Sequence, residues 1–231
     1  MNRSSEPLPE GERKREAVRE MFDSIAPRYD LVNRVMTFGM DVGWRRRTAS
    51  SLGLEKGSLV LDIACGTGDL CRTLEAEGYH AVGIDISEGM LRAARTDAPL
   101  VQADGLALPI ADGAIDGITC GFALRNVVSL TALFEEMARV LRPSGRIALL
   151  EVAQPDNAWL RAGHSFYFNK VVPLVGALLS DRAAYSYLPR SAAYLPPKAE
   201  MLGLLRATGF ADAGTLSLPL GAAQVITGTR S

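Results

Sequence analysis

Two aspartates and a glycine-bearing turn are the residues best suited to chemistry in this chain. Residues 59–63 are apolar, short and rich in branched side chains, which predicts a buried strand. The run ends in the turn Cys65–Gly68, where glycine lets a ligand approach the backbone. Asp62 stands just inside the strand's carboxyl end, and Asp69 follows where a helix can begin. Open α/β sheets bind ligands at this end of their strands, so the turn predicts a binding site.

The acidic residues around the turn argue against a dinucleotide ligand. A dinucleotide fingerprint needs a third glycine three residues after the second, and Cys71 occupies that position. Free N–H groups at a helix start suit a pyrophosphate, but Asp62 and Asp69 would repel one. An acidic, glycine-floored pocket instead suits a ligand with a positive centre and a sugar. S-adenosylmethionine has both, so a nicotinamide-dependent oxidoreductase is the disfavoured alternative.

Further polar residues follow the next apolar runs. Residues 79–84 predict a second strand that ends in Asp85, seventeen residues after Gly68. A carboxylate at this point can accept hydrogen bonds from both hydroxyls of a ribose. A short third strand, 100–103, ends in Asp104-Gly105. An adenine ring would fit between this segment and the glycine turn.

Strands and helices alternate along the chain at a spacing typical of a doubly wound, mainly parallel α/β sheet. Further strands are predicted over 115–122, 146–152, 216–218 and 222–229, and helices over 87–94, 130–141 and 198–208. We expect a disordered tail over 1–15 and one domain over 16–231. That domain includes a helical lid over 16–50, interrupted at Pro27, and a substrate-side helical insertion over 153–195.

Composition narrows the class of partner and the compartment. The net charge of −1 gives no electrostatic footprint for nucleic acid. Three cysteines without metal-ligand spacing are expected to be small buried residues in a reducing compartment, with no metal site. The absence of a secretory segment favours the cytoplasm. The apolar run 171–179 is too short to span a bilayer, yet it can cap a pocket for an apolar substrate.

Six stretches of the chain resemble a known enzyme family. Residues 60–69, 83–90 and 139–145 resemble the class I S-adenosylmethionine-dependent methyltransferases, and residues 21–30 with Asn33, 37–39 and 121–126 resemble the menaquinone/ubiquinone-biosynthesis C-methyltransferases. The resemblance runs from about Glu20 to about Gly209. It implies a seven-stranded Rossmann-like sheet. It also implies C-methylation of a polyprenylated quinol ring, typically demethylmenaquinol to menaquinol, with S-adenosylhomocysteine as the second product.

The resemblance and the strand ends together give a set of candidate site residues. The expected cofactor-binding residues are Asp62, Ala64, Gly66, Thr67, Gly68, Asp85, Ile86, Met90, Asp104, Gly105 and Gly121, and the expected catalytic residues are Arg125, Asn126 and Tyr29. Gly121 replaces a serine of the family, so a side-chain contact is lost there.

The chemistry of a quinol suggests a role for each catalytic candidate. A ring carbon becomes nucleophilic when the adjacent hydroxyl loses its proton, so the site must stabilise a phenolate and later accept the ring proton. We expect Arg125 to stabilise the phenolate, and Asn126 and Tyr29 to help hold a water that accepts the proton. A structural salt bridge from Arg125 to an acid of the lid is the alternative. His164 is a second candidate base, whereas His80 has no expected role.

Some residues depart from the family pattern on the substrate side. Arg190 and Ala193 replace a Glu and an Arg of the family, and Ile226 replaces a His. These departures leave open a relative that acts on another hydroxylated aromatic or natural-product acceptor, or one that binds the cofactor without methylating. Peripheral membrane contact and a homodimer also remain open, whereas a nucleic-acid substrate is disfavoured.

Overall fold

The computed structural model describes residues 11–153, 191 and 194–231. Most of the predicted insertion 153–195 lies outside the described residues. So do His164, the run 171–179, Arg190 and Ala193.

Within the described residues, seven strands form one sheet in the order β3-β2-β1-β4-β5-β7-β6. The strands are β1 (Leu59–Ile63), β2 (His80–Asp85), β3 (Leu100–Gln102), β4 (Ile115–Gly121), β5 (Leu141–Val152), β6 (Phe210–Ser217) and β7 (Ala223–Arg230). β1 to β5 pair in parallel, whereas β7 runs antiparallel to both β5 and β6. The predicted doubly wound, mainly parallel sheet is confirmed.

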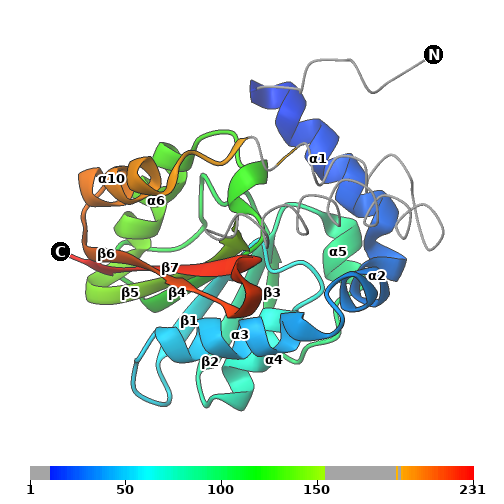
Figure 1. The fold of residues 1–231 in the computed structure, drawn as a ribbon, viewed down its shortest axis with the longest axis horizontal. Coiled ribbons are helices and arrows are strands. Elements are labelled where there is room, and N and C mark those ends of the chain that lie inside the picture. Colours follow the sequence, from blue (N-terminus) through cyan, green and yellow to red (C-terminus); the bar gives the residue numbers. More distant parts are fainter. Residues whose placement is uncertain (1–10, 154–190, 192–193) are drawn as a thin grey trace.

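Helices cover both faces of the sheet (Figure 1). One face carries α3 (Met40–Ser51) and α4 (Asp69–Ala76), and the other carries α6 (Leu130–Val140) and α10 (Lys198–Ala207). Successive side chains of a strand point to opposite faces, so Val60 packs with Trp44 and Leu74 on the first face. Leu61 packs with Phe134 and Leu205 on the second face. The two hydrophobic cores therefore hold the strand ends in place.

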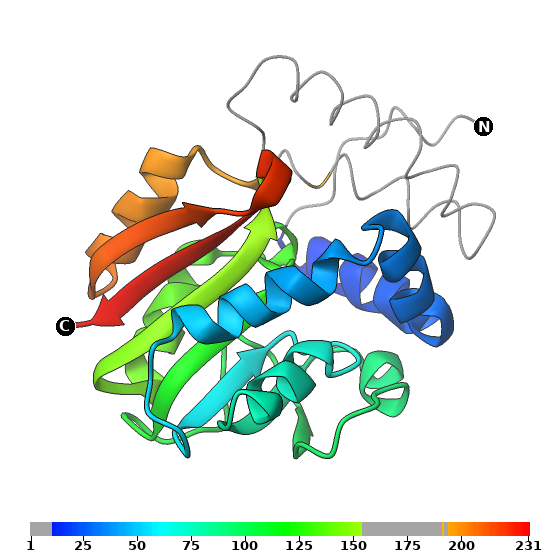
Figure 2. The ribbon, with the colours of Figure 1, turned by 60° about the horizontal axis from the view of Figure 1, so that its bottom comes forward.

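The N-terminal helices lie beyond the carboxyl ends of the parallel strands (Figure 2). They are α1 (Gly11–Ile25), a 3-10 turn η2 (Ala26–Arg28) that contains Pro27, and α2 (Tyr29–Met36). The break at Pro27 is where the sequence predicts it. The predicted tail 1–15 is wrong at its end, because α1 begins at Gly11. Charged residues that look like a solvated tail, Lys14 and Arg15, instead make long-range contacts to Val127 and Asp104.

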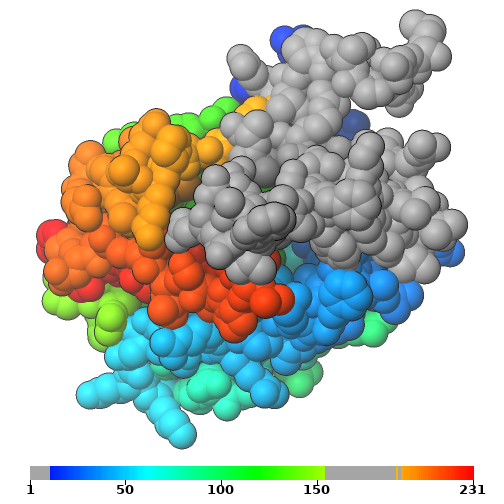
Figure 3. All heavy atoms as spheres, viewed as in Figure 1, coloured from blue at the N-terminus to red at the C-terminus, as the bar shows by residue number. Residues whose placement is uncertain are grey.

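The C-terminal strands differ from the prediction. β6 begins at Phe210 rather than at residue 216. The pairing of β6 with β7 shifts between Ala211 and Gly214, and Asp212 has a φ of 51°. This bulge breaks the alternation that identifies a strand in a sequence. On the face shown in Figure 3, residues of these strands lie beside α3, in agreement with the contacts between α3 and β7.

Two more predictions can be compared with the structure. Ser87 caps the short helix α5 (Glu88–Arg92) as expected, because its side chain accepts a hydrogen bond from Met90 N. The three cysteines are free and buried. No helix within the described part of the chain is long and apolar enough to cross a membrane.

Candidate active site

The glycine turn after β1 follows a left-handed path. Ala64, Gly66 and Gly68 all have positive φ, of 55°, 55° and 80°. A Cβ on Gly66 would lie 3.0 Å from Met90 Cε, so the turn packs closely on α5. A Cβ on Gly68 would lie 2.5 Å from Thr96 Cγ2. Gly68 lines neither of the two cavities beside the turn. Gly68 thus shapes the start of α4, and its expected contact with a cofactor stays a prediction.

Asp85 fixes this turn to the end of β2. Its Oδ2 accepts a hydrogen bond from Gly66 N at 2.8 Å, and its Oδ1 accepts one from Ser87 N at 2.8 Å. Burial raises the pKa of Asp85, and these backbone hydrogen bonds oppose that shift. Each carboxylate oxygen can accept a second hydrogen bond. The geometry therefore leaves room for the two hydroxyls of a ribose.

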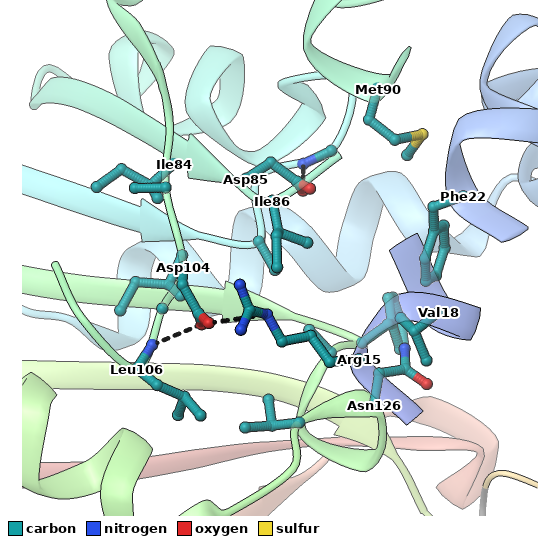
Figure 4. Close-up of a pocket in the computed structure, with 18 of the residues that line it drawn as sticks. Arg15, Val18, Phe22, Ile84, Asp85, Ile86, Met90, Asp104, Leu106 and Asn126 are labelled. Carbon is teal, nitrogen blue, oxygen red and sulfur yellow. Dashed lines mark hydrogen bonds and ion pairs between the residues drawn. The ribbon is translucent and has the colours of Figure 1, made fainter. Parts of the chain in front are cut away.

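An apolar cavity, here called the outer cavity, opens beside Asp85 (Figure 4). It lies between the strand ends and α1, which contributes Arg15, Val18 and Phe22. Its other lining residues are Tyr29, Ile63, Ala64, Gly66, Ile84, Asp85, Ile86, Met90, Ala103, Asp104, Gly105, Leu106, Gly121, Phe122, Ala123, Asn126, Val127 and Val128.

Arg15 reaches across the outer cavity to Asp104 (Figure 4). The distance from Arg15 Nε to Asp104 Oδ2 is 3.2 Å. Asp104 Oδ1 also accepts a hydrogen bond from Leu106 N at 2.9 Å. A Cβ on Gly105 would lie 3.0 Å from Ile63 Cγ2, so glycine keeps this edge of the cavity close to β1.

A second, smaller cavity, here called the inner cavity, adjoins the first. The two cavities share Tyr29, Ala64, Gly66, Gly121 and Phe122. The inner cavity is further lined by Arg45, Asp62, Cys65, Thr67, Asp69, Leu70 and Leu150. The shared residues lie on the glycine turn, at the end of β4 and at the start of α2.

Asp62 is 1% exposed at the floor of the inner cavity. Thr119 Oγ1 donates to its Oδ1 at 2.8 Å, and Cys71 Sγ donates to its Oδ2 at 3.5 Å. Burial raises the pKa of Asp62 to about 7, although both hydrogen bonds oppose the shift. A cationic group in this cavity would favour the ionised carboxylate.

Two of the three expected catalytic residues line the outer cavity. Tyr29 packs edge-on against Phe22, with ring centroids 5.9 Å apart, and burial raises the pKa of its phenol. Asn126 is 8% exposed, and its Oδ1 has no hydrogen-bond partner among the described residues. A buried acceptor that lines a cavity can take a hydrogen bond from a ligand.

Arg125, the third expected catalytic residue, lines neither cavity. It is buried in an ion pair with Glu151, which is fully buried near the end of β5. The Arg125 main-chain N–H also donates to Glu151 Oε2, at 3.4 Å. The alternative expected from the sequence was a salt bridge to an acid of the lid. The salt bridge exists, but the acid comes from the sheet.

Two aspartates of the N-terminal helices contact the loops that follow β1 and β2. Asp23 Oδ1 accepts hydrogen bonds from Ser87 Oγ at 2.6 Å and from Gly89 N at 2.9 Å. Asp30 accepts a hydrogen bond from Thr67 Oγ1, the expected cofactor-binding threonine. The sequence gives no signal for these pairings, since the partners lie far apart along the chain. Arg45, which lines the inner cavity and pairs with Asp41 and Asp69, is not among the residues expected from the sequence either, because three consecutive arginines are typical of a solvated helix face.

The fold and the arrangement of carboxylates define a class of protein. It has a Rossmann-like sheet with carboxylates at the ends of two neighbouring parallel strands, beside a glycine turn. The chain superposes on a solved S-adenosylmethionine-dependent methyltransferase from Thermotoga maritima with a TM-score of 0.65, covering 92% of this chain and 99% of that chain at 19% identity. At this identity the match supports the fold alone.

The chain belongs to the ubiE/COQ5 methyltransferase family, which it matches over residues 10–230. It is 43% identical over 232 residues to the demethylmenaquinone methyltransferase of Roseiflexus sp. (strain RS-1), covering 96% of this chain and 97% of that relative. It is 36% identical to the ubiquinone/menaquinone biosynthesis C-methyltransferase UbiE of Geobacter sulfurreducens, covering 94% of this chain and 90% of that relative. The family predicted from the sequence motifs is confirmed.

Proposed function

We propose that this enzyme transfers a methyl group from S-adenosylmethionine to a ring carbon of a quinol, converting demethylmenaquinol to menaquinol. The observation that carries the proposal is the identity, over nearly the whole chain, to relatives named for this step. The outer cavity supports it, since its lining between α1 and the strand ends is largely apolar. Such a lining suits an aromatic acceptor at the Asn126 end of the cavity, next to the part bordered by Asp85 and Asp104.

The cofactor fits the residues that line the two cavities. Asp85 retains acceptor capacity for the ribose hydroxyls, and Asp104 stands at the edge where the adenine would lie. Gly66 lets the ligand approach the turn, and Ile86 and Met90 supply apolar contacts. S-adenosylmethionine supplies an electrophilic methyl group on a sulfonium. The protein contributes mainly by placing the acceptor carbon in line with that methyl group.

Asn126 and Tyr29 are the residues that we place against the acceptor. The Oδ1 of Asn126, which has no partner among the described residues, accepts the hydrogen bond of a quinol hydroxyl. A water between Asn126 and the Tyr29 phenol takes the hydroxyl proton and passes it to solvent; after the methyl transfer the ring proton moves through this water to the phenolate oxygen, which restores the quinol. Both side chains line the outer cavity, so an acceptor bound there can contact both without a rearrangement of the sheet.

Arg125 acts on the acceptor through position and charge. Its main-chain and side-chain bonds to Glu151 fix the turn η3 (Leu124–Asn126), and thereby the direction of Asn126. Its charge also opposes the rise in the pKa of Tyr29 that burial causes. We therefore assign Arg125 as a positioning residue that favours the phenolate electrostatically.

The direct test supplies both substrates. Purified enzyme is incubated with methyl-deuterated S-adenosylmethionine and a short-chain demethylmenaquinol, and the quinone is analysed by mass spectrometry. We expect one deuterated methyl group on the ring, and none with an Asn126→Leu variant that still binds S-adenosylhomocysteine. Binding of the cofactor without ring methylation would contradict the proposal. The same assay with other hydroxylated aromatics then identifies the acceptor.

The role of Arg125 needs a paired design. Arg125→Ala alone leaves Glu151 buried and unpaired, which costs about 3–5 kcal/mol of stability. The double variant Arg125→Gln, Glu151→Gln removes both charges together. We expect turnover to fall by about a hundredfold, as for loss of one electrostatic contact, while S-adenosylhomocysteine binding is unchanged. Unchanged turnover in the double variant would show that Arg125 is purely structural.

A polyprenylated acceptor resides in a membrane, so the proposal includes a reversible contact with a membrane surface. Sedimentation with vesicles that contain demethylmenaquinol tests this part separately.

A further inference from the structure

We propose that Arg45 binds the carboxylate of the cofactor's amino-acid group in the inner cavity. The donor then lies with its amino-acid end in the inner cavity and its adenosine end in the outer cavity. This inference rests on the proposed function, because it takes S-adenosylmethionine as the methyl donor.

Arg45 points inward, unlike its neighbours in the chain. Its side chain is 12% exposed, whereas Arg46 and Arg47 are exposed. It lies on α3 beside Trp44 and Thr48, which are both buried. Arg45 lines the inner cavity, and it is the one basic residue among the described residues that do so.

Two aspartates hold the guanidinium of Arg45 in place. Asp41, 2% exposed, pairs with Arg45 Nη1, and Asp69 Oδ2 lies 3.0 Å from Arg45 Nη2. Burial alone would raise the pKa of Asp41, but hydrogen bonds from Arg45 and Thr37 hold it below its usual value. Asp41 therefore stays charged and orients Arg45. A guanidinium carries more N–H donors than two ion pairs use, so donors remain for a ligand.

The charges in the inner cavity match an amino-acid group. A zwitterion presents an ammonium and a carboxylate on one carbon, and it needs a partner of each sign. Asp62 and Asp69 are the carboxylates that line the cavity, and Arg45 is its cation. Asp69 is paired with Arg45, which leaves Asp62 for the ammonium. An arginine and a carboxylate form strong charge-assisted hydrogen bonds, especially where water is largely excluded.

The junction of the cavities fixes where the sulfur lies. Tyr29, Gly66, Gly121 and Phe122 line both cavities, so a ligand that spans them passes these residues. The sulfur connects the amino-acid end to the adenosine end and must lie at this junction. Its methyl group is then next to Tyr29, on the side where Asn126 lines the outer cavity. The orientation set by Arg45 thus directs the methyl group toward the acceptor.

The test compares ligands with and without the amino-acid group. Calorimetry measures the binding of S-adenosylhomocysteine and of 5′-methylthioadenosine, which keeps the adenosine and sulfur only. We expect Arg45→Gln to weaken S-adenosylhomocysteine binding by about tenfold or more, as for loss of a charge-assisted hydrogen bond, and to leave 5′-methylthioadenosine binding unchanged. Arg45→Lys should recover part of the loss.

Arg72→Gln is the matched control. Arg72 also pairs with Asp69, but it is 40% exposed and does not line the inner cavity. Its loss should change neither affinity. Equal weakening of both ligands by Arg45→Gln, or no weakening, would overturn the inference.

A second test compares two ligands of the wild-type enzyme, so it does not depend on whether a variant folds. Decarboxylated S-adenosylhomocysteine should bind at least about tenfold more weakly than the intact ligand. Equal binding of the two would also overturn the inference while leaving the proposed function intact. Failure of the wild-type enzyme to bind S-adenosylhomocysteine would instead contradict the proposed function itself.

Discussion

Asp85 joins the glycine turn to the ligand that the turn is proposed to bind. Its two oxygens each accept one backbone hydrogen bond, from Gly66 and from Ser87. In Asp85→Asn an amide NH2 must face one of these N–H donors, so the turn loses a bond and the ligand loses an acceptor. We expect affinity for S-adenosylhomocysteine to fall by about a hundredfold, measured by calorimetry. Asp112→Asn, at a side chain that is 80% exposed, is the control and should bind normally.

Replacing Gly121 is expected to raise the affinity for the cofactor product, whereas replacing Asp85 lowers it. A Cβ at Gly121 would meet only Leu70 Cδ2, at 3.8 Å, among the described residues, so a side chain fits there. Because Gly121 lines both cavities, a serine would add a hydroxyl at their junction. We expect Gly121→Ser to raise the affinity for S-adenosylhomocysteine by about fivefold, the net value of one hydrogen bond. Gly121→Val, which adds volume without a donor, should not; equal gains would rule out a hydrogen bond.

At this scale, the sequence predicts residues whose function depends on their neighbours in the chain. Asp62 lies at the carboxyl end of a predicted strand, and Gly66 and Asp85 come soon after predicted strands, so their place at the sheet edge can be inferred. Arg45 and the partner of Arg125 could not be predicted this way. Glu151 is 26 residues from Arg125 in sequence, and the register of β4 and β5 brings them together. A single sequence does not specify that register.

The helices of the lid extend this reasoning to whole elements. α1 docks on the cofactor loops through Asp23, which accepts hydrogen bonds from Ser87 and Gly89. A Cβ on Gly89 would lie 3.0 Å from Asp23 Cα, so the two backbones are in close contact. α1 also contributes Arg15, Val18 and Phe22 to the outer cavity, so movement of this helix widens the cavity.

We therefore expect Asp23→Ala to speed release of S-adenosylhomocysteine by about tenfold, since two hydrogen bonds of the lid are lost. Stopped-flow displacement measures the release rate, and hydrogen exchange of residues 11–25 should rise in the same variant. Glu88→Ala, which removes only an exposed ion pair with Arg92 on α5, is the control. Unchanged release with faster exchange would show that α1 does not gate the cavity.

The strands and helices also show which predictions a sequence pattern cannot make. The predicted bounds of β1, β2 and β4 agree with the structure within one residue, because a continuous apolar run survives small irregularities. β5 begins at Leu141, five residues before its predicted start. The bulge in β6 hid most of that strand, and long-range contacts of Lys14 and Arg15 stabilise a helical turn that composition assigns to a tail. In both cases the deciding contacts come from distant parts of the chain.

For the whole molecule, the alternation of strands and helices was enough to predict the fold. Right-handed crossovers and burial of both faces leave few ways to arrange such a chain. The same architecture places Asp62 between the two cores, where it is 1% exposed. The Asp62 carboxylate suits a cationic ligand, but when it is ionised and no ligand is bound it lowers the free energy of unfolding.

The free energy of unfolding should therefore depend on pH through Asp62. The pKa of Asp62 is about 7 in the folded chain and about 3.9 in an unfolded one. Between these two pH values Asp62 is protonated in the folded state and ionised in the unfolded state. The free energy of unfolding therefore falls as pH rises from about 4 to about 7 and then levels off. At about 1.4 kcal/mol per pKa unit, the loss is about 4 kcal/mol.

Asp62→Asn removes this titration while it keeps the shape of the side chain. Urea unfolding without cofactor should give similar stabilities for variant and wild type near pH 4. The variant should gain steadily up to about pH 7, where the difference becomes constant. Asp97→Asn, at an exposed position, is the control variant. Saturating S-adenosylhomocysteine should favour the wild type above pH 7, because its ammonium compensates the Asp62 carboxylate; a pH-independent difference would mean that Asp62 does not titrate in this range.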